Sequence, residues 1–165
     1  MVRIEKIEND KVPYELLLLA DESDEQIKKY KDSAVFLAAR LDGEIVGIIG
    51  LNEIEENSLE IVNLAVDESH QNRKIGTELL KAAIAEAKAK RYRELIIKTG
   101  NCGIMQLYLY QRVGFRFQAI NRDYFLENYP LPIYENGIRC VDQIVLAMTL
   151  AHVELPAFSG ERNEQ

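Results

Sequence analysis

One short segment of the chain has the residues expected of a phosphate-binding helix start. An apolar stretch ends at Val66, and helical spacing of apolar residues begins at Ile75, so a strand, a turn and a long helix are expected in that order. The first N–H groups of a helix lack intrahelical acceptors and carry partial positive charge, which favours phosphate. Arg73 and Lys74 add full charges beside Gly76. Taken alone, the segment is a weak signal that favours an ordinary helix start, because a glycine near a helix start and two basic residues are both common.

A second group of residues lies about 35 positions further along the chain. Asn101 follows an expected strand, and the segment 110–115, Tyr-Gln-Arg-Val-Gly-Phe, closes an expected helix. Gly114 is placed to end that helix in a left-handed conformation. Tyr110 has three-residue spacing with Leu107 and Val113, so it either packs in the core or faces a site.

The charge is distributed unevenly along the sequence. The net charge is −7, yet residues 71–98 contain 8 Lys or Arg against 3 Asp or Glu, while residues 1–70 contain 7 against 17. An acidic protein with one basic segment does not resemble a general binder of nucleic acid or of anionic membranes. The basic segment is either a solvated helix face or a site for a small polyanion.

Length and composition indicate one domain over residues 1–150, followed by a polar tail, 151–165. No apolar run approaches the roughly 20 residues of a membrane span. We therefore expect a cytoplasmic protein that does not bind membranes. Cys102 and Cys140 lie far apart and form no disulfide framework, which suits a reducing compartment. The chain's few Cys and His residues include no close pair, so no metal site is expected.

The expected elements alternate between strands and helices and predict a mixed α/β sheet with helices on both faces. Asp42-Gly43 predicts a tight hairpin, and Ser23 with Gln26 predicts a helix start. The expected strands are 2–7, 34–41, 44–51, 59–66, 95–98, 115–120 and 144–150, and the expected helices are 13–20, 23–31, 75–91 and 104–113. The connection 121–142 is long for a compact domain, and ordered loops of this length are often functional.

Taken together, the two groups of residues resemble the signature of the GNAT superfamily of acyl-CoA-dependent N-acetyltransferases. The segment 71–76, Gln-Asn-Arg-Lys-Ile-Gly, resembles its pyrophosphate motif, and Asn101 with the segment 110–115 resembles the downstream motif. The order of expected elements agrees over residues 2–150. Residues 14–21 and 129–137 resemble an uncharacterised bacterial branch of the superfamily. Lys74 departs from the pattern, because the family usually has glycine there. Either this position has a positive φ, which costs lysine on the order of 1 kcal/mol, or Lys74 is the first helical residue. We expect the second, because the helical periodicity begins at Ile75.

The resemblance implies a mostly antiparallel sheet whose fourth and fifth strands splay apart, with the pantetheine arm of acetyl-CoA in the gap. The pyrophosphate would lie on the N–H groups of residues 73–77, and a backbone N–H near Val66 would hold the oxyanion. Tyr110 would be the general acid. The implied co-substrate-binding residues are Leu64, Ala65, Val66, Gln71, Asn72, Arg73, Lys74, Ile75, Gly76, Thr77 and Asn101.

Several roles stay open at the level of the sequence. The general base is either Glu53 or Glu60, unless both are ordinary surface carboxylates. The acceptor, a small-molecule or peptide primary amine, would contact the long connection through Tyr124, Tyr134 and Glu135. A non-catalytic acyl-CoA sensor of the same fold is the alternative to an enzyme that transfers acetyl directly in a ternary complex. A Cys102 nucleophile is disfavoured, because neither His70 nor His152 has supporting local sequence. A homodimer is a possible assembly.

Overall fold

A seven-stranded sheet forms the centre of the computed structural model, which describes residues 1–150. The expected polar tail, 151–165, lies outside the described residues. Neighbouring strands are antiparallel except for one parallel pair, β4 and β5. In spatial order the strands are β1 (Arg3–Ile7), β2 (Val35–Leu41), β3 (Glu44–Glu55), β4 (Ser58–Val66), β5 (Glu94–Gly100), β9 (Gln143–Thr149) and β6 (Arg116–Asn121).

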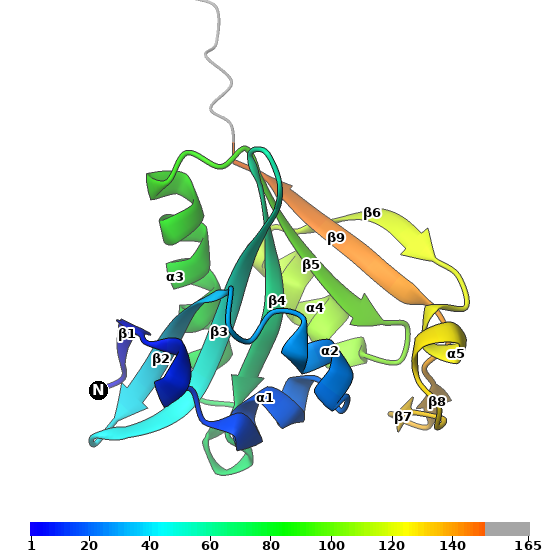
Figure 1. Cartoon of the computed structure of the whole chain (residues 1–165), viewed down its shortest axis with the longest axis horizontal. Helices are drawn as coiled ribbons and strands as arrows, with labels where there is room; N and C mark the ends of the chain where they lie inside the picture. Colours follow the sequence, from blue (N-terminus) through cyan, green and yellow to red (C-terminus); the bar gives the residue numbers. More distant parts are fainter. Residues whose placement is uncertain (151–165) are drawn as a thin grey trace, which may run out of the picture.

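Helices cover both faces of the sheet, as the sequence predicts (Figure 1). α1 (Tyr14–Ala20) and α2 (Asp24–Lys28) bury Leu17 and Ile27 against Phe36 and Ile48 of β2 and β3. On the other face lie α3 (Ile75–Ala89) and α4 (Ile104–Val113). The core on that face contains Leu79, Leu80, Tyr110, Phe115 and Leu146. The expected fold class is confirmed.

Local sequence signals explain where several elements begin and end. Asp42 and Gly43 both have positive φ, 52° and 89°, as a tight β2–β3 hairpin requires. The Ser23 hydroxyl accepts the Gln26 N–H at 3.3 Å and so caps the start of α2. Gly114 has a φ of 120° and ends α4.

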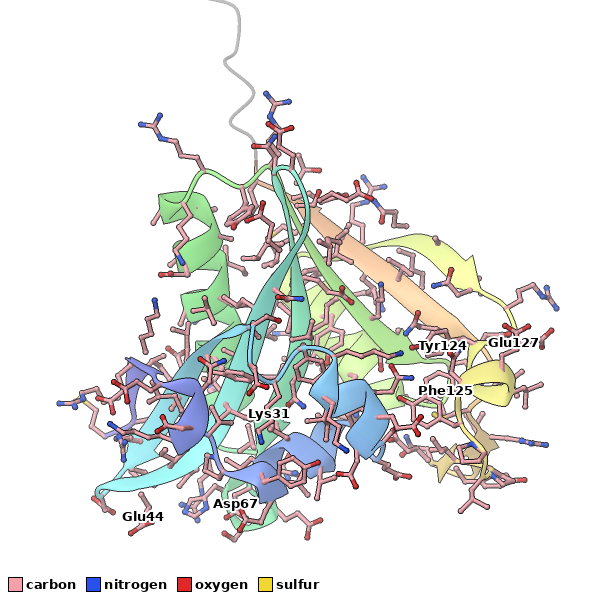
Figure 2. All side chains as sticks on the ribbon, viewed as in Figure 1. Lys31, Glu44, Asp67, Tyr124, Phe125 and Glu127 are labelled. Carbon is pink, nitrogen blue, oxygen red and sulfur yellow. A yellow bond between two sulfur atoms is a disulfide. The ribbon has the colours of Figure 1, made fainter. Side chains whose placement is uncertain are left out.

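The long connection, residues 121–142, has secondary structure of its own. It contains α5 (Tyr124–Asn128) and a small hairpin of β7 (Tyr134–Glu135) and β8 (Ile138–Arg139). Tyr124 and Phe125 lie on the side of α5 that faces β5 (Figure 2). The connection therefore forms a wall beside the sheet.

β4 and β5 pair over only half of their length. Their pairing runs from Ser58 opposite Glu94 to Ile61 opposite Ile97 and stops there. At the same point β4 is irregular: Leu51 of β3 faces Ile61, but Gly50 faces Asn63, so Val62 is an extra residue. Such a bulge bends a strand and increases its twist. The bend explains why the two strands diverge toward α1 and α4 (Figure 1).

Candidate active site

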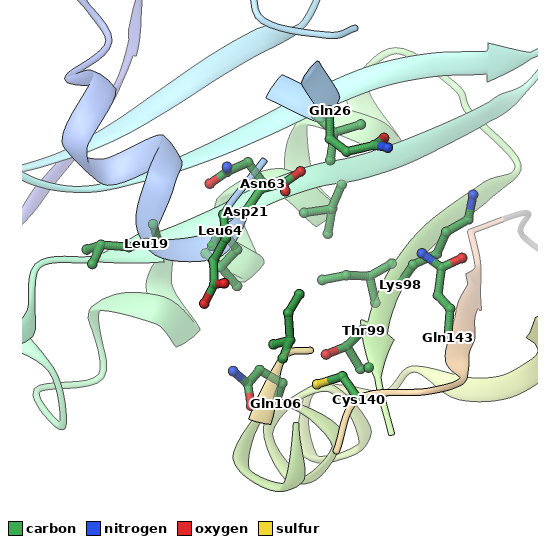
Figure 3. Close-up of a pocket in the computed structure, with 18 of the residues that line it drawn as sticks. Leu19, Asp21, Gln26, Asn63, Leu64, Lys98, Thr99, Gln106, Cys140 and Gln143 are labelled. Carbon is green, nitrogen blue, oxygen red and sulfur yellow. The ribbon is translucent and has the colours of Figure 1, made fainter. Parts of the chain in front are cut away.

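A cleft of about 550 Å³ opens where β4 and β5 separate. One wall consists of the α1–α2 junction and the bulged half of β4, and the other consists of the end of β5, α4 and the connection that contains α5. Figure 3 shows Asp21, Asn63 and Leu64 in this cleft together with Lys98 and Thr99 of β5. The cleft thus lies between segments that are far apart in the sequence.

The free edge of β4 presents backbone hydrogen-bonding groups to the cleft. The Asp67 N–H donates to the Val46 carbonyl of β3 at 2.8 Å. Because successive residues of a strand point their N–H and C=O groups to opposite edges, Leu64 and Val66 point away from β3. The Val66 carbonyl accepts a bond from Gln71 Nε2 at 3.1 Å, while its N–H and the Leu64 backbone face the gap. An extended ligand could pair with this edge as an added strand.

The start of α3 offers unpaired N–H donors. The Glu78 N–H bonds to the Lys74 carbonyl at 3.0 Å, but the N–H groups of residues 75–77 have no acceptor within residues 1–150. A Cβ on Gly76 would lie 3.8 Å from Leu109 Cδ2 and 3.9 Å from Val66 Cγ2, which is ordinary contact. The protein's own packing therefore does not require glycine here, and the backbone stays open to an approaching group.

The expectation for Lys74 was wrong. Lys74 is the N-cap of α3 and has a left-handed backbone, with φ 64° and ψ 11°, instead of being the first helical residue. Asn72, two residues earlier, also has a positive φ of 62°. Left-handed residues turn successive N–H groups toward one side, which makes a concave surface for an anion. The loop therefore has, at Lys74, a left-handed backbone that glycine adopts most readily.

Tyr110 both packs in the core and faces the cleft, which are the two alternatives that the sequence left open. Its ring packs edge-on against Phe115, with centroids 6.3 Å apart, and the residue is only 6% exposed. The same side chain lines the cleft. Burial, and to a lesser extent the charge of Glu135, raises the pKa of the Tyr110 hydroxyl. The phenol is therefore protonated at neutral pH, which is the state required of a proton donor.

The two candidate bases lie in different places. Glu60 lines the cleft and forms an ion pair with Lys98 of β5, with Nζ and Oε1 3.2 Å apart. Glu53 instead accepts a hydrogen bond from the Tyr92 hydroxyl at 2.8 Å and lines a separate pocket of about 190 Å³. Glu53 pairs with Leu59 near the far end of the β3–β4 hairpin, so the topology keeps it away from the cleft.

Asn101 holds the long connection in place. Its Oδ1 accepts the N–H groups of Val141 and Asp142 at 2.8 and 3.1 Å, and its Nδ2 donates to the Arg139 carbonyl at 3.1 Å. Asn101 is not among the cleft-lining residues. These bonds give it a structural role, and its predicted contact with a co-substrate stays a prediction.

The inference that the two cysteines form no disulfide framework was also wrong. Cys102 and Cys140 form a disulfide, with Cα atoms 5.1 Å apart, and both line the cleft. The bond joins the start of α4 to the segment that leads into β9. The sequence did not indicate this pairing, because the two cysteines are 38 residues apart. They come together only where the connection over 121–142 folds back toward β5.

Of the three acceptor-site candidates, Tyr124 and Glu135 line the cleft. Tyr134 does not, and it is 63% exposed. Sequence reasoning missed many polar residues of the cleft wall, among them Asp21, Tyr30, Asn63 and Tyr129. A polar residue inside the apolar strand pattern of β4 was the one available signal, and it pointed to Asn63.

Two further properties concern the whole of the described chain. Within residues 1–150, no group of three or more His, Cys, Asp or Glu side chains is placed to hold a metal ion. None of the helices in the same range is both long and apolar enough to cross a bilayer.

Comparison with known proteins agrees with this geometry. Residues 2–115 match the Acetyltransferase (GNAT) family. The chain is 42% identical over 142 residues to the uncharacterized N-acetyltransferase YvbK of Bacillus subtilis, covering 86% of this chain and 91% of that protein. The fold and the cleft are thus those of a GNAT acetyltransferase, and the chain belongs to this family.

Solved structures of relatives include bound co-substrate. A GNAT family acetyltransferase from Elizabethkingia anophelis with acetyl-CoA bound is 45% identical, with a TM-score of 0.86 over 90% of this chain and 97% of that one. A Bacillus subtilis acetyltransferase in complex with CoA is 41% identical, with a TM-score of 0.86 over 92% of this chain and all of that one.

Proposed function

We propose that this protein transfers the acetyl group of acetyl-CoA directly to a primary amine in a ternary complex. The observation that carries the proposal is the cleft itself. Leu64 and Val66 of the free β4 edge line one wall, and the protonated Tyr110 lines the other. The unpaired N–H groups of residues 75–77 lie outside the cleft lining, where Gly76 is next to Val66. The acetyl-CoA and CoA bound by the two relatives support the choice of co-substrate.

The residues present fit such a co-substrate. An extended pantetheine arm would pair with Leu64 and Val66, as a strand pairs with a free edge. The pyrophosphate would lie on the N–H groups at the start of α3, with Arg73 and Lys74 adding charge. Acetyl-CoA is made and used inside cells, so the cytoplasm remains our proposed location.

Groups that line the cleft can carry out the proton transfers that the proposed reaction needs. The acceptor ammonium loses one proton, to Glu60 through a water molecule or to solvent, and becomes nucleophilic. The neutral nitrogen attacks the thioester carbonyl, and the Val66 N–H stabilises the oxyanion. As the C–S bond breaks, Tyr110 donates its proton to the sulfur. The proton then lost by the new amide nitrogen returns to Tyr110.

The substitution Tyr110→Phe tests the catalytic role. It removes one hydroxyl and keeps the apolar ring in the core, so folding and acetyl-CoA affinity should be unchanged. Loss of a general acid should lower the turnover of amine acetylation by about 10²- to 10⁴-fold. The measurement is release of free CoA thiol over a panel of amines, beside a binding titration with acetyl-CoA.

Tyr108→Phe is the matched control, because Tyr108 lies on the same helix, is 54% exposed and does not line the cleft. Turnover of Tyr110→Phe within a few-fold of wild type would remove Tyr110 from the mechanism. A wild-type protein that binds acetyl-CoA and acetylates no amine would instead be an acyl-CoA sensor of the same fold.

A further inference from the structure

The end of the cleft beside α1 contains a carboxylate with no cationic partner. Asp21 follows α1 and lines the cleft, and no Lys or Arg within residues 1–150 lies within 4 Å of its carboxylate. Lys29 also lines the cleft and its charge acts on Asp21, but its Nζ donates to Gln26 Oε1 at 3.0 Å and forms no ion pair with Asp21. Glu60, on the same β4 wall of the cleft, is already paired with Lys98. Partly buried carboxylates usually have a partner, so Asp21 is the exception that needs explaining.

The hydrogen bonds of Asp21 fix its position and leave one oxygen free. Oδ1 accepts the Tyr129 hydroxyl at 3.1 Å and the Ser23 N–H at 3.2 Å. Oδ2 accepts no bond from any residue between 1 and 150. Tyr129 follows α5, so this contact joins the two walls of the cleft. The free oxygen is thus preorganised at a place that a substrate can reach.

A second unsatisfied acceptor lies on the same wall. Asn63 is 3% exposed, and its Nδ2 donates to the Leu17 carbonyl and the Tyr30 hydroxyl at 3.0 and 2.9 Å. Its Oδ1 is buried and has no hydrogen-bond partner. A buried polar atom without a partner is uncommon and costs stability. A ligand group that only donates hydrogen bonds would complement both this oxygen and Asp21 Oδ2.

Aromatic residues adjoin both side chains, because Tyr129 is hydrogen-bonded to Asp21 and Tyr30 to Asn63. Tyr124, Phe125 and Tyr129 form one cluster, with ring centroids 5.3 to 6.5 Å apart, and all three line the cleft with Tyr30. Aromatic faces attract cations and contact methylene groups well. Carboxylate, amide oxygen and aromatic rings together describe a site for an ammonium group on an aliphatic stem.

This ammonium would be a different group from the nitrogen that reacts beside Tyr110. Asp21 follows α1 on one wall of the cleft, whereas Tyr110 belongs to α4 on the other wall. We propose that Asp21 Oδ2 and Asn63 Oδ1 form a subsite for a second ammonium group of the acceptor. The substrate class is then an aliphatic diamine or polyamine, with one nitrogen at Tyr110 and another at Asp21. This inference rests on the proposed acetyltransferase function.

The test compares amines that differ only in the distant group. The probes are straight-chain α,ω-diamines of increasing length, each beside the n-alkylamine and the ω-amino alcohol of equal length. At neutral pH the distant amine is protonated. The wild type should acetylate the best diamine with kcat/KM at least about 10-fold above its alkylamine, because hydrogen bonds to charged groups are worth more than neutral ones.

Asp21→Asn keeps the size of the side chain and its Oδ1 acceptor while removing the charge. It should raise KM for diamines and lower their kcat/KM by about 10- to 100-fold, with little change for alkylamines. Glu25→Gln is the control, because it removes the same charge from an exposed position of α2 that does not line the cleft. Asp21→Glu should restore part of the diamine preference.

Equal losses for diamines and alkylamines in Asp21→Asn, or no diamine preference in the wild type, would overturn the subsite while leaving the enzyme intact. If no amine is acetylated although acetyl-CoA binds, the acetyltransferase proposal fails. Calorimetric titration of diamines into the acetyl-CoA complex of wild type and Asp21→Asn then still decides the subsite. Tighter binding by the wild type supports it, and equal or absent binding refutes it.

Discussion

Lys74 shows how a backbone conformation can be kept after the residue that favours it is lost. A left-handed φ costs a non-glycine residue about 1–2 kcal/mol, and Lys74 has a φ of 64°. Lys74→Gly should therefore raise the free energy of unfolding, by about 0.5–1 kcal/mol after the greater chain entropy of glycine is deducted. Urea unfolding measures the change. Lys74→Ala removes the same charge without relieving the backbone, so an equal gain in both variants would contradict this explanation.

Asp21 should cost the protein stability at neutral pH. Burial is the main cause that raises the pKa of its carboxyl group, with nearby Glu22 adding to the rise and Lys29 opposing it. A folded-state pKa above the unfolded one contributes stability below the unfolded pKa of about 3.9, and this contribution is lost as pH rises through the folded-state pKa. Asp21→Asn should therefore be as stable as wild type or more stable at pH 7, with the difference shrinking toward pH 4.

Urea unfolding of the two proteins across this pH range checks the sign. If Asp21→Asn lowers the free energy of unfolding by more than about 1 kcal/mol at pH 7, the carboxylate stabilises the fold as a hydrogen-bond acceptor. Asp21 would then not destabilise the protein at neutral pH. The proposed subsite fits the opposite result, because residues kept for binding are often unfavourable in the empty protein.

Residues whose roles depend on local sequence were predictable, and those that depend on tertiary contacts were not. Gly76 and Tyr110 belong to spaced motifs, so their positions at a helix start and on a cleft wall followed from the sequence. Asp21 and Tyr129 are 108 positions apart and meet only when α5 folds back over the cleft. Glu53 and Glu60 looked equivalent until the register of β3 and β4 separated them.

The same division holds for whole elements. The β2–β3 hairpin and the start of α2 followed from short turn and capping patterns, and the structure confirms both. The bulge at Val62 has no comparable signal, because it depends on how β4 registers against β3. The sequence predicted a loop over 121–142, because α5 is only 5 residues long and β7 and β8 have 2 residues each. Elements this short depend on tertiary contacts, which the periodicity of the sequence does not indicate.

The disulfide joins the connection over 121–142 to the segment between β5 and α4. Cys102 precedes α4 and Cys140 follows β8, and Asn136 Nδ2 donates to the Cys102 carbonyl at 3.0 Å beside it. Cross-links that close loops of this size stabilise by about 2–4 kcal/mol. Reduction should lower the free energy of unfolding by that amount and loosen the cleft wall. Unfolding with and without reductant measures it, with the double variant Cys102→Ser and Cys140→Ser as the control that reductant should not affect.

At the scale of the molecule, the basic and the acidic segments of the sequence contribute to two different sites beside β4. The basic segment 71–98 contains the start of α3, where the anionic end of a co-substrate would lie. The acidic segment 1–70 supplies Asp21, Glu22 and Glu60 to the part of the cleft proposed for a cationic acceptor. The homodimer that the sequence allows stays a prediction.

A ligand that fills this cleft should stabilise the entire fold. Acetyl-CoA would pair with β4 and the start of α3 only in the native state, because β4, β5 and α3 come together only on folding. At 100 times its dissociation constant, such a ligand adds about 2.7 kcal/mol to the free energy of unfolding. Thermal melts at increasing acetyl-CoA concentration should therefore show a rising midpoint in the wild type.

Gly76→Glu should fold, since a Cβ there makes only ordinary contacts, but its carboxylate would repel the pyrophosphate and abolish the shift. An unchanged wild-type midpoint would refute co-substrate binding, and an undiminished shift in Gly76→Glu would move the phosphate site away from α3.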